Sequence, residues 1–178
     1  KWTATISETF PGTVTDAQST FAAARVHIAR NNWDDAMTAF DRLNNMPDLG
    51  GARVPGGTTK DEVQFLRAFV LEQKRSFEEA IEAYLSIPDG RDEYYGSRAT
   101  ERLIGFLEIQ DAQAAIEGKL NSLLAQPFDG KDHEADRRRL QAALRVTADP
   151  AERVRLLELL KNTYSKLLAY NKAPTFNL

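Results

Sequence analysis

Two stretches of the sequence decide the fold: NNWDDAMTAFDRL, residues 31–43, and KRSFEEAIEAYLSI, residues 74–87. In each stretch a turn precedes an aromatic residue, an alanine follows three positions later, and a second aromatic residue follows four positions after the alanine. Residues at spacings of three and four lie on one face of a helix. Each stretch therefore predicts a helix whose small residue allows a neighbouring helix to approach closely.

The two stretches align as a repeat, and a third, weaker copy follows. The matching positions are Trp33 with Phe77, Ala36 with Ala80, and Phe40 with Tyr84. The third copy, IQDAQAAIEGKLNSL at residues 109–123, aligns through Ala115 and has Lys119 in place of the second aromatic residue. The aligned alanines are 44 and 35 residues apart. Because a period near 34 is typical of tetratricopeptide repeats, the pattern resembles that family, with a glycine-rich insertion from Leu49 to Thr58 explaining the longer offset.

Helix-forming residues fill the chain between a few glycine and proline positions, and alternating β-branched runs are missing. We therefore predict an all-α fold of about eight helices. Helices are expected to start near Asp16, Asp34, Thr59 or Asp61, Ser76, Asp92 or Glu93, Asp111, Asp132 and Asp149. Antiparallel pairs of the tetratricopeptide type would stack into a right-handed superhelix with a concave inner surface. An irregular helical bundle with a chance pattern is the alternative.

This pattern predicts three parts along the chain. Residues 1–15 form an N-terminal extension, residues 16–126 hold the helix-pair repeats with a loop at 47–60, and residues 127–178 hold C-terminal helices. The last helix is the most amphipathic segment. Its apolar positions, expected on one stripe, are Val154, Leu157, Leu160, Tyr164, Leu167 and Leu168. Such a helix either caps the array or docks a neighbour.

The composition bears on the possible partners. The formal net charge of −3, from 23 basic and 26 acidic residues, favours neither nucleic acid nor an anionic membrane. The absence of cysteine excludes disulfides and thiolate metal sites. No apolar run reaches the roughly 20 residues that a membrane-spanning helix needs. We expect no nucleic-acid partner and no membrane span.

The chain shows no pattern of reactive residues. Its acidic residues stand at helix starts or near basic residues, rather than as a pair facing each other across a cleft. The two histidines, His27 and His133, have no histidine or acidic neighbour in a ligand pattern at i+4. The glycine-rich loop follows a helix, whereas a phosphate-binding loop follows a strand. We expect no catalytic residue, no metal and no cofactor.

In arrays of helix pairs, the first helix of each pair lines the groove. Taking Ala36 and Ala80 as equivalent positions, the candidates for a partner-binding groove are Gln18, Phe21, Arg25, Glu62, Phe65, Phe69 and Gln73. Half-exposed aromatic residues often anchor interfaces. The alternative is that the three phenylalanines belong to the core between helices. The lysine and asparagine residues of a clamp for a C-terminal carboxylate are missing from these positions.

A more particular resemblance concerns residues 77–106, FEEAIEAYLSIPDGRDEYYGSRATERLIGF. The run YYGSRATERL after IPDG is similar to the helical superhelix segment of soluble lytic transglycosylases, periplasmic bacterial enzymes that cleave peptidoglycan. In that family the catalytic glutamate stands in a Glu-Ser dipeptide upstream of a Gly-Leu-Met-Gln stretch, and this chain contains neither. The resemblance therefore implies an accessory helical domain without the catalytic one.

We therefore expect a non-enzymatic helical-repeat module that binds or scaffolds a protein or peptide partner. The alternative is the accessory superhelical domain of a periplasmic lytic transglycosylase. Its partner would then be peptidoglycan or a catalytic domain of the same parent chain. A periplasmic or otherwise exported location fits this alternative, and a cytoplasmic location stays open.

Overall fold

The computed structural model describes residues 2–172, with side chains described for residues 3–169. Within this range the chain forms nine α-helices and no β-strand, which confirms the predicted all-α fold. The helices are α1 (Trp2–Thr9), α2 (Val14–Ala29), α3 (Trp33–Asn44), α4 (Lys60–Gln73), α5 (Phe77–Leu85), α6 (Tyr94–Gly105), α7 (Gln110–Leu124), α8 (His133–Val146) and α9 (Pro150–Lys172), with a short 3₁₀ helix, η1 (Phe106–Glu108), before α7.

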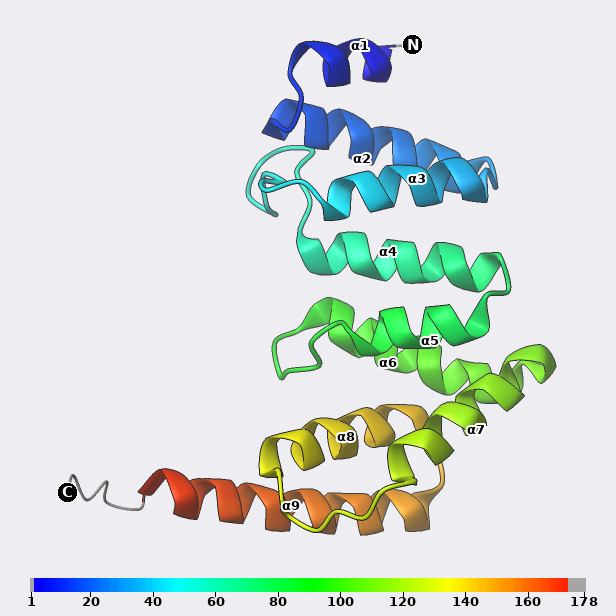
Figure 1. Cartoon of the computed structure of the whole chain (residues 1–178). Coiled ribbons are helices and arrows are strands. Elements are labelled where there is room, and N and C mark those ends of the chain that lie inside the picture. The colour runs from blue at the N-terminus through cyan, green and yellow to red at the C-terminus, as the bar shows by residue number, and fades with distance from the viewer. Residues whose placement is uncertain (1, 173–178) are drawn as a thin grey trace. The chain divides into compact units, whose positions relative to one another are not determined.

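The chain divides into two compact units, one ending at Arg102 and the other beginning at Leu103. In the first unit α2, α3, α4 and α5 run in alternating directions, each packed on the next (Figure 1). In the second unit α7 packs on α8 and α8 on α9. The predicted limits 1–15, 16–126 and 127–178 stay a prediction.

Side-chain caps fix several helix starts. Thr59 accepts the backbone N–H of Glu62, and Asp132 accepts that of Ala135 at 2.9 Å. Asp149 accepts the N–H of Glu152 at 3.1 Å, immediately before Pro150. A side-chain oxygen satisfies one of the N–H groups that lack a partner in the first turn. The predicted starts at Thr59, Asp132 and Asp149 are therefore confirmed.

Asp16 is not the cap of the helix predicted to start near it. Thr13 caps α2 by accepting the N–H of Asp16, and the helix begins at Val14. Asp16 lies inside the first turn and is completely buried. The predicted N-terminal extension also contains a helix, α1, which packs on α2.

The anchors of the first two sequence copies lie in the core of the first unit. Ala36 and Phe40 of α3, and Ala80 and Tyr84 of α5, are all completely buried. A tight contact between helices requires the alanines, and the aromatic ring one turn further fills the adjacent space. The two copies therefore bury the same positions.

The register predicted for the third copy is wrong by three residues. In α7 the fully buried residues are Ala112 and Ile116, whereas Ala115 and Lys119 are only half-buried. The small residue and the large one after it are still four apart. The sequence alignment selected the second of two nearby alanines because spacing alone does not indicate which one faces inward.

The predicted loop at 47–60 is closed at its base. Thr58 donates its N–H to the carbonyl of Leu49 at 3.0 Å, and Gly51 donates to that of Thr58 at 3.1 Å. Leu49 is buried in the core of the first unit. Gln18 of α2 donates to the carbonyl of Pro55 at 2.8 Å, which ties the tip of the loop to the first helix of the pair.

The helices α7, α8 and α9 enclose a core cluster that is mostly aliphatic. Its buried residues are Leu140, Ala143 and Leu156, with half-buried leucines of α7, α8 and α9 around them. The predicted single stripe on the last helix is wrong, because its apolar residues divide into two groups. Leu160 and Leu167 are half-buried, whereas the exposed residues are Val154, Leu157, Tyr164 and Leu168. No helix in the described residues is long and apolar enough to cross a bilayer.

Candidate functional site

Aromatic rings join α4 to the start of α6. The ring of Phe65 lies 5.6 Å from that of Tyr95 and 5.7 Å from that of Tyr84, measured between centroids. Tyr94 packs edge-on against Tyr95 at 5.0 Å and is 67% exposed. Aromatic pairs at such distances stabilise each other beyond their buried area. The result is a continuous row of rings that runs from the core to the surface.

Polar groups border this row at the start of α4. Glu62 accepts a hydrogen bond from the Thr58 hydroxyl at 2.7 Å. The Tyr95 hydroxyl also donates to Glu62, and both burial and this carboxylate raise the tyrosine's pKa. Tyr95 therefore stays protonated as a hydrogen-bond donor at neutral pH.

A second ring and a buried carboxylate lie further along α4. Phe69 packs edge-on against Trp33 of α3 at 6.3 Å, and the Arg102 guanidinium lies 5.8 Å from the centre of the Phe69 ring. Arg102 pairs with Glu72 and donates through Nε at 3.0 Å. The Tyr84 hydroxyl donates to the same carboxylate at 2.9 Å. Glu72 is only 6% exposed, so these donors compensate a buried charge and link α4 to α5 and α6.

We call the surface formed by these two helices the α4–α6 face. It consists of Glu62, Phe65, Phe69, Tyr94, Tyr95 and Arg102. A glycine permits the approach of α6 at its first turn, because a Cβ at Gly96 would overlap the carbonyl oxygen of Pro88. The Tyr-Tyr-Gly run thus has a local packing reason in addition to its aromatic contacts.

The structure brings together only part of the predicted groove set. Glu62, Phe65 and Phe69 lie on the α4–α6 face, and all three are half-buried. Phe21 is only 6% exposed and belongs to the core of the first unit, so for this ring the core alternative is correct. Arg25 is exposed, with its guanidinium 6.0 Å from the centre of the Phe21 ring.

The two glutamines of the predicted set differ. Gln18 is half-buried and holds the loop through Pro55, whereas Gln73 is exposed at the end of α4. Sequence reasoning missed Tyr94, Tyr95 and Arg102, which α6 contributes. In the predicted scheme of helix pairs, the helix that follows the second pair is again a first helix, and this rule would have selected α6.

The most connected buried carboxylate lies at the other end of the first unit. Asp16 accepts the Ser7 hydroxyl at 2.6 Å, the Gly12 N–H at 2.9 Å and the Arg42 guanidinium at 2.8 Å. Burial alone would raise the pKa of Asp16, but these hydrogen bonds and the charge of Arg42 outweigh it and hold the pKa below its usual value. The carboxylate joins α1, α2 and α3 as a structural element.

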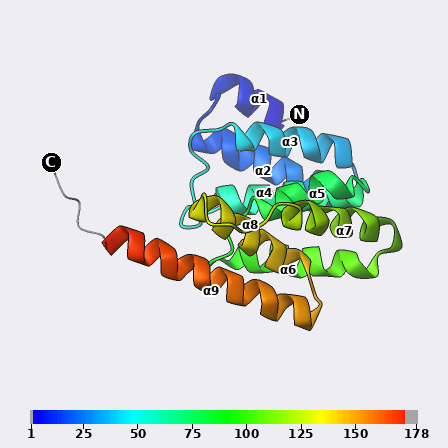
Figure 2. The same ribbon diagram turned by 60° about the horizontal axis from the view of Figure 1, so that its bottom comes forward.

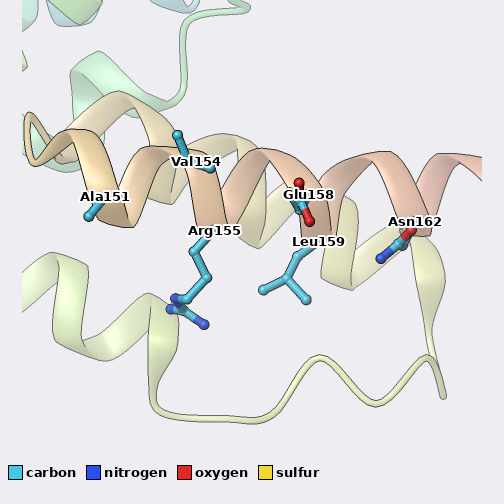
Figure 3. Close-up of a pocket in the computed structure, with 6 residues that line it drawn as sticks. All are labelled: Ala151, Val154, Arg155, Glu158, Leu159 and Asn162. Carbon is cyan, nitrogen blue, oxygen red and sulfur yellow. The ribbon is translucent and has the colours of Figure 1, made fainter.

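In the described residues, neither the histidines nor two surface hollows bring three or more metal-ligating side chains together. His27 Nδ1 lies 3.6 Å from the Asp35 carboxylate. An open, polar hollow of about 470 Å³ lies at the turn between α2 and α3, where Lys74 pairs with Asp34 at 2.6 Å. A second hollow, of about 490 Å³ and more apolar in its lining, is formed by residues of α9 (Figure 3).

Comparisons with protein-family models, with curated proteins and with solved structures find no match for this chain. The site is therefore defined by its own geometry. It consists of a row of rings reaching the surface at Tyr94, with donors and acceptors along its border.

Proposed function

We propose that the chain is a non-catalytic helical-repeat module that binds a protein or peptide partner on the α4–α6 face. The observation that carries the proposal is the exposed Tyr94 ring, which continues into the half-buried rings of Tyr95 and Phe65. Rigid aromatic side chains of this kind are the usual anchors of protein interfaces. Glu62 and Arg102 would supply polar contacts of opposite charge at the border.

The shared burial of the first two copies supports a tetratricopeptide-like repeat, and we propose that the pairs stack into a right-handed superhelix. A non-enzymatic role is supported by the two most enclosed carboxylates, Asp16 and Glu72. Each is held by several donors, including an arginine. A general acid or base needs a carboxyl group free to exchange its proton with a substrate.

The test is site-specific photo-cross-linking in the cells that produce the chain. A photoreactive phenylalanine analogue replaces Tyr94 in one variant and Val26, an exposed residue of α2, in the matched control. We expect one discrete protein adduct from position 94 and none from position 26. Adding Phe65→Ala to the position-94 variant should reduce the adduct, because the supporting row of rings is then interrupted.

An adduct that forms equally at positions 94 and 26, or none at 94, contradicts the proposal. Circular dichroism of each variant establishes that the helices are intact. If Phe65→Ala loses helical signal, Tyr94→Ser is used in its place. The unlabelled Tyr94→Ser chain should then compete less well than the wild-type chain for the partner that the photoreactive chain cross-links.

A second candidate is the accessory domain of a periplasmic lytic transglycosylase, bound to peptidoglycan or to a catalytic domain of the same parent chain. It is supported by the segment 77–106, in which Gly96 fits against Pro88 and the exposed Tyr94 packs on the half-buried Tyr95. Exposed aromatic rings can stack on sugar rings as well as on side chains. Its test is co-sedimentation with purified peptidoglycan.

For this second candidate we expect the chain to sediment with peptidoglycan and Tyr94→Ala to reduce the bound fraction. Val26→Ala is the control and should leave binding unchanged. Absence of co-sedimentation together with a protein cross-link at position 94 supports the first candidate over the second.

A further inference from the structure

The last helix carries an apolar surface in addition to the one that contacts its own core. Val154 is 60% exposed, Leu157 51%, Tyr164 40% and Leu168 57%. We call these four residues the outer stripe. Single exposed apolar residues are common on protein surfaces, but a line of four large ones on one helix is typical of an interaction surface.

Val154, Leu157 and Leu168 lie on a different side of α9 from the core contacts, whereas Tyr164 lies at the edge of the stripe, where its hydroxyl accepts a hydrogen bond from Gln141 of α8 at 3.1 Å. At about 100° per residue, the outer stripe is centred roughly 120° around the helix from the positions that face the core. Those core-facing positions include Leu156 and Thr163, which are buried. In Figure 3, Val154 points to one side of α9, and Leu159, which packs against the core, points to the other.

The outer stripe has the spacing of a helix–helix seam. Positions 154, 157, 161, 164 and 168 alternate steps of three and four residues, as a and d positions do in a coiled coil. Lys161 occupies the central position. Such a narrow line fits another helix along its length. The 23 residues of α9 exceed the 14 of α8, and its C-terminal turns extend beyond α8 (Figure 2).

Two charged residues at the outer stripe indicate which kind of helix would pack against it. Glu158 borders the outer stripe beside Lys161, and within the described residues neither side chain has a hydrogen bond or an ion pair. Six residues earlier, Glu152 and Arg155 at the same spacing do pair, at 2.5 Å. A partner helix should therefore present a positive charge opposite Glu158 and a negative charge opposite Lys161.

A second copy of α9 in antiparallel orientation meets this requirement. Turned about a two-fold axis near residues 158–161, it places Glu158 of each copy beside Lys161 of the other and covers both outer stripes. A parallel pair in register would instead place the two Lys161 side chains together. We propose that the chain forms a homodimer through antiparallel pairing of α9 along the outer stripe. This inference is independent of the α4–α6 face.

The first test measures the mass of the full chain by sedimentation velocity over a wide range of concentration. We expect a concentration-dependent dimer, which Leu157→Glu converts to a monomer by burying a charge in the seam. Asn162→Glu, an exposed residue of α9 outside the outer stripe, is the matched control and should still dimerise. Circular dichroism verifies the fold of both variants; since Leu157 is exposed, the monomer should keep its helical content.

The second test is a charge exchange. Glu158→Lys and Lys161→Glu should each raise the dissociation constant at least about tenfold, because each places like charges together at two symmetric points. The double variant Glu158→Lys with Lys161→Glu restores opposite charges and should recover most of the affinity.

Three results overturn the proposal. One is a wild-type chain that stays monomeric at every concentration. Another is a dimer that Leu157→Glu leaves intact. The third is a double charge variant no tighter than the single variants, which rejects the antiparallel arrangement. None of these results affects the cross-linking test at Tyr94.

Discussion

The two units bury their carboxylates in different ways. In the first unit Asp16 accepts donors from α1 and α3 as well as its own helix, and Glu72 accepts donors from α5 and α6. In the second unit Asp136 accepts the Gly130 N–H at 3.1 Å and pairs at 3.5 Å with Arg139, one turn along α8. The first two carboxylates connect different helices, whereas the third only connects a helix to the loop before it.

This difference affects how specifically each unit is packed. A buried charge tolerates only neighbours that supply donors, so Asp16 and Glu72 select which helices pack together. Leucines in the second unit pack against one another with less directional preference. In the second unit the polar contacts between helices come from arginines that donate to backbone carbonyls, as Arg139 of α8 does to Leu123 of α7 at 2.8 Å. Its last helix keeps a set of apolar residues that its own core does not use.

The largest expected effect is in the aromatic core of the first unit. Phe40→Ala should lower the free energy of unfolding by about 3–5 kcal/mol, because it leaves a cavity at a completely buried position. Both tryptophans, Trp2 and Trp33, belong to this unit, so urea unfolding followed by tryptophan fluorescence reports on it. A loss below about 1 kcal/mol would mean that the core collapses around the missing ring.

A smaller loss of stability is expected from removing the Asp16 carboxylate, which joins three helices. Asp16→Ala should cost about 2–3 kcal/mol in the same fluorescence experiment, since it leaves several donors without their acceptor. Asp136→Ala, followed by circular dichroism, should cost less, on the order of 1 kcal/mol, because its donors come from the adjoining loop and the same helix. Equal losses would remove the distinction between the two units.

The stability that the Asp16 carboxylate contributes should depend on pH in a known direction. The pKa of Asp16 is lower in the folded chain than the ordinary 3.8, so the unfolded chain binds more protons between the two values. Its contribution to stability is complete above pH 3.8 and is lost as the pH falls through the folded pKa. The stability difference between wild type and Asp16→Ala should therefore shrink on acidification, and a constant difference contradicts this.

Loss of a helix cap in the second unit should lower the free energy of unfolding less than the loss of Asp16 does. Asp132→Ala removes the acceptor for the N–H of Ala135 and should cost about 1 kcal/mol. Circular dichroism is the appropriate probe, because both tryptophans lie in the other unit. Asp132→Asn is the matched control, since asparagine caps helices about as well, and it should stay near wild type.

The smallest effect is expected on the outer stripe. Val154→Ala, measured at a concentration where the chain is monomeric, should change stability by less than about 0.5 kcal/mol, because the side chain is 60% exposed. A loss above 1 kcal/mol would indicate that Val154 contributes to the core of its own chain. The expected contrast with Phe40→Ala separates apolar residues that fold the chain from those available to a partner.

The sequence was sufficient for the helices but not for their mutual contacts. Spacing predicted the amphipathic helices, and the caps at Thr59, Asp132 and Asp149 followed from local chemistry. Aspartate is a common helix-capping residue, but Asp16 instead joins helices, and this role depends on Arg42, 26 positions away. A local pattern contains no information about such a distant donor.

The candidate site was predicted only in part for the same reason. Phe65 and Phe69 were selected by their position on a first helix, but Phe21, selected by the same criterion, is buried. Tyr95 and Arg102 became part of the site only because α6 packs against α4. On α9, periodicity identified the apolar residues but did not separate those that face the core from those that are exposed. Both groups recur at helical spacings.

The loop between α3 and α4 offers a practical consequence. Gly50 and Thr58 pair as an isolated bridge, so the chain enters and leaves this loop at adjacent points, while residues 52–56 between them are exposed. A peptide tag or a whole guest domain inserted between Ala52 and Arg53 would therefore start and finish close together, and would not pull α3 and α4 apart. That makes the loop a suitable place to attach a fluorescent reporter.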